Sequence, residues 1–136
     1  MTIQYATAVN NAKLDAIETN IGTAPVLELW NGTKPANCGT ADTGTKIANG
    51  TLPSDWMANA ASASKAKSGT WTLTGLAGAG SGTAAQYFRL TVAGVCVMQG
   101  SVTATGGGGD MTMDNQSVAN NQVVTVNSFS IAAANT

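Results

Sequence analysis

Two aspartates that follow a run of glycines form the stretch of this chain whose residue types come closest to a ligand-binding motif. Residues 103–115 read TATGGGGDMTMDN, which places Asp110 and Asp114 just beyond Gly106–Gly109. A phosphate-binding loop needs a helix behind its glycines and a Lys followed by Ser or Thr, so that backbone amides and the helix dipole converge on the anion. Here the alternating segment Met111–Met113 follows, and no Lys is near. The stretch therefore predicts a corner between two strands.

The same two aspartates could in principle bind a cation. Calcium loops supply several oxygen ligands at a recognisable spacing, and the spacing of Asp110 and Asp114 does not match it. We expect Asp110 to accept hydrogen bonds from turn amides, and Asp114 with Asn115 to begin the next turn. The sequence thus predicts no metal site, and no motif in it indicates a cofactor.

Catalysis is disfavoured by the side chains that the chain lacks. It contains no histidine, which removes the commonest general base and rules out Ser-His-Asp and Cys-His sites. Glycoside hydrolysis would need two carboxylates on either side of a cleft, and no spacing among the acidic residues argues for such a pair. The residues considered are Glu18, Glu28, Asp42, Asp55, Asp110 and Asp114. We expect a protein that is not an enzyme.

The two cysteines, Cys38 and Cys96, are far apart in the sequence. In a reducing compartment the default for such residues is a pair of buried free thiols, which is the interpretation we favour. A disulfide stays possible if the fold brings them together and the protein later meets an oxidising medium. Two cysteines without histidine do not make a zinc site.

Three tryptophans could stack on a ligand such as a sugar ring. Trp71 lies in an alternating strand pattern, and Trp56 lies in a segment, 52–60, that resembles one capped helical turn, so both are expected in the core. Trp30 ends a strand on the parity opposite Leu27 and Leu29. It is therefore the best candidate for an exposed contact.

Composition limits the classes of partner. Of the 136 residues only 10% are charged, the net charge is −1, and 43% are apolar, so nothing attracts nucleic acid or anionic lipid. No apolar run is long enough to span a bilayer, and no secretory signal is visible, so we expect synthesis in the cytoplasm. A surface of Thr, Ser, Asn and Gly is poorly defended against association, which suits a protein packed against copies of itself or a partner.

An amphipathic helix is predicted over residues 8–21. Leu14, Ile17 and Ile21 follow the spacing of one apolar stripe, and Gly22 suits the position just past the end. Asp15 and Glu18 are expected to point away from that stripe. The stripe could pack on the body of the protein or dock on a neighbouring subunit. We accordingly divide the chain into an N-terminal helical arm, 1–24, and a β-sandwich domain, 25–136.

Beyond residue 25, short alternating segments separated by Gly and Asn predict strand after strand. We expect a long loop over 31–44, a short strand within 45–52 broken at Asn49-Gly50, and a mobile polar segment over 61–69 that carries Lys65 and Lys67. Over 123–131 the apolar parity slips, and a bulge near Asn127-Ser128 would bring both halves into one core. The fold class is mainly β: an antiparallel β-sandwich, Ig-like or jelly-roll-like, with an N-terminal α-helical arm.

Three segments resemble small virion proteins of tailed bacteriophages and prophages. They read TIQYATAVNNAKLDAIETNIGTAPVLEL, TLPSDWMANAASASKAKSGTW and GGGGDMTMDNQSVANNQVVTVNSFSI. The resemblance covers nearly the whole chain, with the phrases in the same order. It implies a structural, head decoration-like component of a phage particle and supplies no catalytic residues.

Two hypotheses follow from the residues and the resemblance together. The first is a capsid decoration (cement) protein, homo-oligomeric, which binds the major capsid protein where capsid subunits meet. Its candidate contacts are Leu14, Ile17, Ile21 and Trp30. The second is a tail, neck or fibre component whose loops 31–44 and 76–85 touch a host glycan or protein. Both place the protein in the virion, bound to the major capsid protein or another virion protein.

Overall fold

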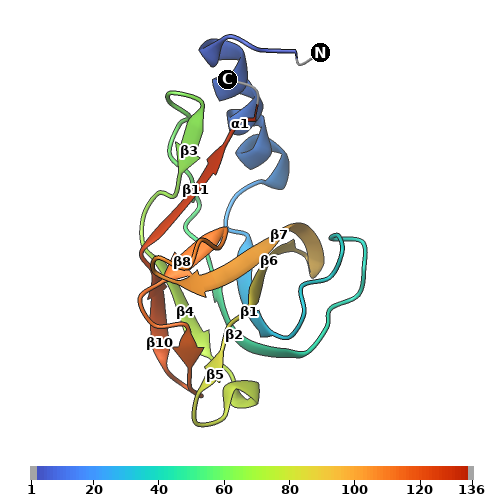
Figure 1. Cartoon of the computed structure of the whole chain (residues 1–136), viewed down its shortest axis with the longest axis vertical. Helices are drawn as coiled ribbons and strands as arrows, with labels where there is room; N and C mark the ends of the chain where they lie inside the picture. The colour runs from blue at the N-terminus through green and yellow to red at the C-terminus, as the bar shows by residue number, and fades with distance from the viewer. Residues whose placement is uncertain (1–2, 135–136) are drawn as a thin grey trace.

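The computed structural model describes residues 3–134 and is mainly β, with one α-helix at the N-terminal end (Figure 1). The helical elements are α1 (Thr7–Ile21) and a short 3-10 helix, η1 (Ala77–Ala79). The strands are β1 (Val26–Asn31), β2 (Thr45–Thr51), β3 (Ser64–Ala66), β4 (Trp71–Gly75), β5 (Thr83–Ala84), β6 (Tyr87–Val92), β7 (Val95–Ala104), β8 (Met111–Met113), β9 (Ser117–Val118), β10 (Val123–Val126) and β11 (Ser128–Ala132). The predicted mainly β fold with an N-terminal helix is confirmed.

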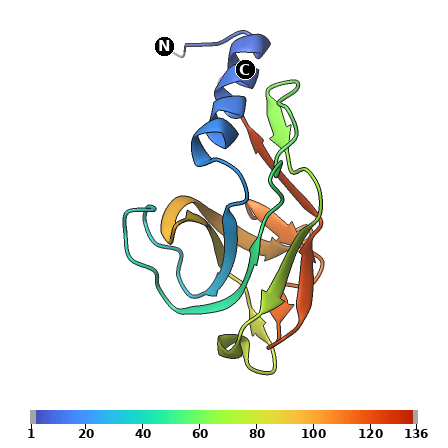
Figure 2. The ribbon, with the colours of Figure 1, turned by 180° about the vertical axis from the view of Figure 1, so that it is seen from behind.

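Nine of the strands form one sheet in the order β10-β4-β2-β1-β6-β7-β8-β11-β3, and β5 pairs separately with β9. Every pairing in the large sheet is antiparallel except that of β7 with β8. The sheet curls strongly, so that β8 and β10 contact each other although five strands separate them in the order. Because of this curl, parts of the sheet face each other as in a β-sandwich, and the core lies between them. Figures 1 and 2 show this curled body with α1, β3 and the end of β11 projecting from one end.

The core is one cluster of buried apolar side chains with a chain of aromatic rings through it. Trp56 packs on Trp71, Trp71 on Phe129, and Phe129 edge-on against Phe88, with ring centroids 5.3–6.1 Å apart. The expectation that Trp56 and Trp71 lie in the core is therefore confirmed. The predicted helical turn around Trp56 does not form, because residues 56–58 instead run extended beside 66–68 and bond to them.

Two further segments differ from expectation in their local structure. β2 is continuous through Asn49 and Gly50, because only glycine fits at position 50: a Cβ there would collide with the carbonyl oxygen of Thr72. The apolar side chains over 123–131 do change from one alternation phase to the other. The change falls between two strands, β10 and β11, rather than at a bulge within one strand. β10 pairs with β4, and after Asn127 the chain leaves β4 and pairs as β11 with β8 and β3. Val124, Val126 and Phe129 are all buried, so both halves share one core as predicted.

The glycine run at 106–109 is a corner between strands, as predicted, but of an unusual kind. It joins β7 to the adjacent parallel strand β8, a connection that ordinarily takes a dozen residues or more. The chain turns back within 105–110 because Gly106 and Gly108 adopt positive φ (+87° and +77°) and because Gly107 and Gly109 pass directly over Thr103. Asp110 closes the corner: its carboxylate accepts hydrogen bonds from the backbone N–H and the hydroxyl of Ser101, both at 2.8 Å.

Substituting Gly107 by alanine is expected to destabilise the protein by about 2 kcal/mol, because overpacking against a fixed neighbour typically costs about 1–3 kcal/mol. A Cβ at position 107 would lie 2.7 Å from Thr103 Cβ. The matched control is Gly39→Ala, since a Cβ at position 39 meets only the end of the Asn37 side chain at 3.2 Å. Urea unfolding of the two variants provides the measurement. Equal midpoints would show that the corner does not depend on close packing over Thr103.

Candidate functional site

One side of α1 is joined to the body by a polar stripe at helical spacing. Three side chains of this stripe accept hydrogen bonds from backbone N–H groups of the segment that leads into β3. These bonds run from Ala63 N–H to Asn11 Oδ1 (2.9 Å), from Ala60 N–H to Asp15 Oδ1 (2.8 Å) and from Met57 N–H to Glu18 Oε1 (3.1 Å). Asp15 and Glu18, expected only to point away from the apolar stripe, therefore face the segment that leads into β3. They fasten the helix to the body.

Lys65 in β3 is the centre of this attachment. Its ammonium lies 2.8 Å from Asp15 Oδ1 and 3.0 Å from Glu18 Oε2, and it donates to the carbonyl of Ala58 at 2.9 Å. The Lys65 side chain is only 1% exposed, whereas that of Asp15 is 43% exposed. The predicted mobile polar segment 61–69 is thus a strand held between α1 and β11, and its lysine is buried rather than solvated.

The ionisation of the pair follows from these contacts. The hydrogen bond from Lys65, helped by the one from the Ala60 amide, holds the pKa of Asp15 below its ordinary value of 3.8. Burial alone would lower the pKa of Lys65, but the hydrogen bonds and charges of Asp15 and Glu18 together outweigh it and raise that pKa above 10.5. Both groups are therefore charged at neutral pH.

Attachment of α1 is expected to be pH-dependent at both ends of the scale. Because the Asp15 pKa is lowered on folding, its contribution is complete above 3.8 and is lost as the pH falls through the lower folded value. Because the Lys65 pKa is raised, its contribution is complete below 10.5 and is lost as the pH rises beyond that value. Hydrogen exchange of α1 amides, compared with β1 amides between pH 5 and 2, measures the acid limb. An Asp15→Asn variant should show a smaller change, and an equal change in both proteins would contradict this account.

The apolar stripe predicted on α1 faces the protein's own body. Leu14 is buried, Ile21 packs against the core cluster, and Ile17 is half-buried. Of the two roles considered for this stripe, the structure uses Leu14 and Ile21 for packing on the body. The opposite side of the helix carries Val9, Ala12 and Ala16, all exposed. We call these three residues the arm face.

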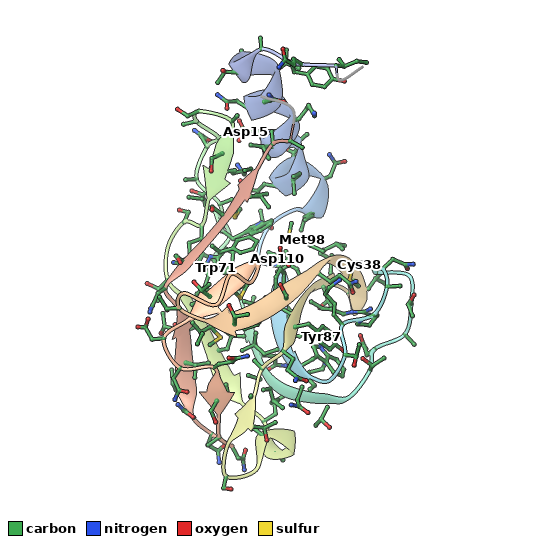
Figure 3. The ribbon with its side chains drawn as sticks, viewed as in Figure 1. Asp15, Cys38, Trp71, Tyr87, Met98 and Asp110 are labelled. Atoms are coloured by element: carbon green, nitrogen blue, oxygen red, sulfur yellow. A yellow bond between two sulfur atoms is a disulfide. The ribbon has the colours of Figure 1, made fainter. Side chains whose placement is uncertain are left out.

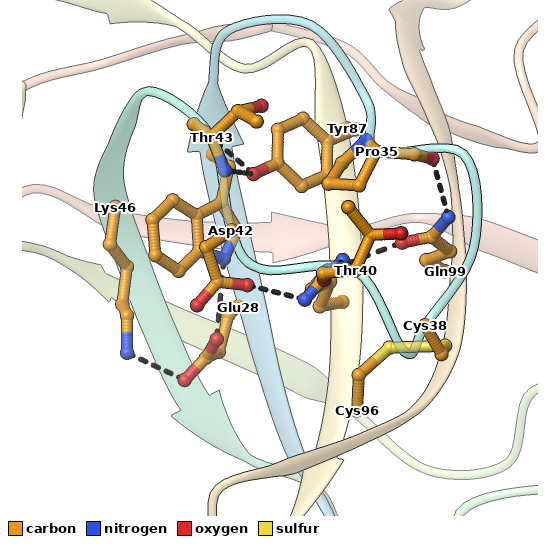
Figure 4. Close-up of polar contacts among 12 residues, drawn as sticks. Glu28, Pro35, Cys38, Thr40, Asp42, Thr43, Lys46, Tyr87, Cys96 and Gln99 are labelled. Atoms are coloured by element: carbon orange, nitrogen blue, oxygen red, sulfur yellow. Dashed lines mark hydrogen bonds and ion pairs between the residues drawn. A yellow bond between two sulfur atoms is a disulfide. The ribbon is translucent and has the colours of Figure 1, made fainter.

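Trp30 is buried, so the expectation of an exposed contact at this residue is wrong. Its ring stacks on that of Tyr87 (centroids 6.0 Å apart, planes at 12°), and its indole N–H donates to Glu28 Oε2 at 3.2 Å. Glu28 also forms an ion pair with Lys46 at 2.6 Å. Strand alternation correctly placed Trp30 on the side of the sheet opposite Leu27 and Leu29. It could not show that this outer side is covered by another segment of the chain (Figure 4).

Loop 32–44 provides that cover, and a buried arginine holds it in place. The Arg89 guanidinium donates to Asp42 Oδ1 at 2.6 Å, to the carbonyl of Thr40 at 2.8 Å and to the carbonyl of Asn37 at 3.3 Å. Gln99 donates to the carbonyl of Pro35 at 2.8 Å. The predicted long loop is therefore present but closely bonded to the outer face of β6 and β7, as Figure 4 shows.

Cys38 and Cys96 form a disulfide between this loop and β7, with Cα atoms 5.2 Å apart. The favoured interpretation of two free thiols is therefore wrong. The two residues are brought together because loop 32–44 folds back over the sheet, a contact between segments that are distant in the sequence. Tyr87 adds a further bond, its hydroxyl donating to the carbonyl of Thr43 at 2.7 Å.

Comparison with protein-family models, curated proteins and solved structures finds no match. The geometry of this chain alone therefore has to indicate a role. Within residues 3–134 no three acidic, cysteine or histidine side chains gather as a metal site would require. Asp110 and Asp114 are engaged in the corner, the latter accepting from the hydroxyl of Thr105 at 3.2 Å. No helix in this part of the chain is long and apolar enough to cross a membrane.

Exposed apolar side chains in the described residues lie chiefly at two places. Ile3, Tyr5 and Val9 are exposed at the N-terminal end of the molecule, and Val92, Val95 and Val97 lie around the turn between β6 and β7. Neither group was predicted as an exposed contact, because periodicity selects residues that share one face of a helix or strand. The signal for the first group was the alternation of Ile3 and Tyr5 before the helix begins.

Proposed function

We propose that this protein is a non-enzymatic structural component of a bacteriophage virion that decorates the head by binding the major capsid lattice. The resemblance of three sequence segments to small virion proteins supports the virion as its location. The observation that carries an attachment role is the rigid mounting of α1: one side is fastened by Lys65 and the polar stripe, while the arm face stays exposed and uncharged.

An attachment element works best when its conformation is set before it binds, because less ordering is then required on association. In α1 the ordering is done within the chain by Asp15, Glu18 and Lys65. The three residues of the arm face are uncharged, and the exposed Lys13 borders them, so a capsid contact here would leave the Lys13 ammonium hydrated at its rim. Small side chains at Ala12 and Ala16 allow close approach of another backbone or helix.

The test is the copy number of the protein in purified virions, measured by quantitative mass spectrometry against the major capsid protein. Decoration predicts a fixed stoichiometric fraction of the capsid subunits. Binding of the purified protein to heads that lack it, with Val9→Asp as the variant and Val123→Asp as the control, tests the arm face; both valines are exposed, at 46% and 65%. Absence of the protein from virions would overturn the proposal.

A tail, neck or fibre role is the second candidate, and loop 32–44 is the observation that favours it. A loop fixed by Arg89 and the Cys38–Cys96 disulfide can present a preformed surface to a host glycan or protein. A copy number of a few to a few dozen per virion would select this role over head decoration. Loop 76–85 lies near the opposite end of the molecule from α1 (Figure 1) and would be the additional contact.

A further inference from the structure

Strand β7 has an open edge along part of its length. One side pairs with β6, but on the other side β8 pairs only with Val102–Ala104. The N–H of Ser101 points to this second side, where it bonds Asp110, while the N–H of Val102 bonds Gln86 on the β6 side. Because these directions alternate along a strand, the N–H and C=O of Gln99 also point to the open side. In the described part of the chain no strand pairs with them there.

Strand β11 is open toward the same space. It pairs with β8 over Ser128–Phe129 and, on its opposite side, with β3 over Ser130–Ala132. β8 begins at Met111, so this strand does not extend far enough to pair with Ser130–Ala132. The two open edges flank a groove of about 300 Å³. Where the groove starts, a single strand, β8, occupies the space between β7 and β11.

The base of this groove is apolar, and Asp110 is the one charged residue among those that line it. Phe88, Met98, Phe129 and Ile131 line it, and of these Met98 and Ile131 are only partly buried against the core. Figure 3 labels Met98 and Asp110 at this place, below the base of α1. Natural edge strands are commonly defended by Lys or Pro, but neither β7 nor β11 contains a charged residue or a proline. A bulge at Val97 limits the accepting stretch of β7 to Met98–Gly100.

The segment that precedes α1 has the properties of a strand without a sheet. Ile3–Ala6 lies outside any helix or strand, Ile3 and Tyr5 are 66% and 40% exposed, and they alternate with Gln4 and Ala6. Among the hydrogen bonds of residues 3–134, none uses the amide N–H of Ile3, Gln4 or Tyr5. The contacts of Tyr5 are with α1: its carbonyl accepts from Asn10 Nδ2 at 3.4 Å and Lys13 Nζ lies 4.3 Å from its ring centroid, so insertion would replace these two contacts. The segment cannot reach its own groove, because the 15 residues of α1, about 22 Å long, lie between them. In Figures 1 and 2 it extends from the far end of α1, away from the body.

We propose that residues 3–6 of one copy of this protein insert as an added strand between β7 and β11 of a second copy. Gln99 supplies backbone hydrogen bonds from one side and Ser130–Ala132 from the other, and Ile3 and Tyr5 cover Met98 and Ile131. Strand addition of this kind derives affinity from main-chain bonds and specificity from alternate side chains. Neither segment carries a charge of its own, and the one carboxylate that lines the groove, Asp110, is already bonded to Ser101. The inference does not depend on the capsid role, since it concerns contacts between copies alone.

The test is sedimentation velocity of the full chain over a wide concentration range. The wild-type protein should self-associate, and Ile3→Ser/Tyr5→Ser should dissociate at concentrations at least tenfold higher without a change in thermal midpoint. The matched control is Val95→Ser/Val123→Ser, which removes exposed apolar surface away from the N-terminal end (66% and 65% exposed) and should associate like wild type. A monomeric wild type at every concentration would overturn the proposal, as would equal association of the two double variants.

Cysteine trapping locates the contact. Tyr5→Cys combined with Ser130→Cys should yield covalent oligomers under mild oxidation, whereas Tyr5→Cys combined with Ser81→Cys should not, because residue 81 is exposed but distant from the groove. Equal cross-linking of both pairs would show random collision and reject the groove as the acceptor. Neither result depends on the number of copies per virion, so failure here and failure of the capsid proposal are distinguishable.

Discussion

Replacing Lys65 by alanine is expected to lower the free energy of unfolding by about 3 kcal/mol and to release α1 from the body. Removal of one partner of a buried ion pair typically costs about 3–5 kcal/mol, and the Lys65 side chain is 1% exposed. The lower end of this energy range is expected because water can hydrate the partly exposed Asp15 carboxylate once Lys65 has been removed. The loss has two parts: the ion pairs themselves and the space left by a buried lysine stem.

Urea unfolding measures the total effect, and hydrogen exchange separates its parts. In Lys65→Ala the amides of α1 should lose protection well before those of β1 and β6. The control is Lys34→Ala, in which an exposed lysine is removed, and a change within about 0.5 kcal/mol is expected for it. If the two variants had the same stability, Lys65 would not be the attachment point of the helix.

Removing the disulfide, by Cys38→Ser/Cys96→Ser, is expected to destabilise the protein by about 4 kcal/mol. The bond closes a loop with a sequence separation of 58 residues, and the chain-entropy relation gives roughly that value for a loop of this size. Loop 32–44 should be affected most, because Arg89 and Gln99 would then hold it without a covalent link.

Unfolding with and without reductant, together with the double-serine variant, provides the measurement. Reduced wild-type protein and the variant should agree, and both should lie well below oxidised wild type. The serine variant keeps the Arg89–Asp42 ion pair. If the amides of loop 32–44 lose more hydrogen-exchange protection than the fall in global stability explains, the additional loss is due to the missing disulfide. Equal stability of oxidised and reduced protein would mean that the polar bonds to Arg89 alone fix the loop.

The periodicity of the sequence correctly predicted the elements that have one buried face and one exposed face. The helix over 8–21 and the strand at Trp71–Gly75 each have one apolar side and one exposed side, and both form as expected. Parity failed for β6, where Tyr87, Phe88, Arg89 and Leu90 are all buried. Alternation assigns a side of the sheet correctly, but only the long-range fold of loop 32–44 decides that the outer side is covered.

The interactions that matter most in the candidate site are polar and distant in sequence. Lys65 lies in a stretch of small polar residues, ASASKAKSG, that has the composition of a mobile loop. Its burial depends on Asp15 and Glu18, and no local pattern connects these residues with it. The spacing of Asn11, Asp15 and Glu18 along one side of the helix was visible, but polar stripes usually mark solvent. The disulfide was hidden for the same reason, since its cysteines meet only after the loop has folded back.

The attachment of α1 also gives the molecule two distinct ends. Ala63 bonds to Asn11 through its N–H and to Ala133 through its carbonyl, so the first helix and the end of the last strand lie together at one pole. The turn at residues 80–82 lies toward the other pole, beyond η1 (Figure 1). A peptide fused to either end of the chain would therefore project from the pole that carries the arm face. A peptide inserted at Ser81 would project from the opposite pole, which makes this turn the position for an insertion that leaves the arm face uncovered.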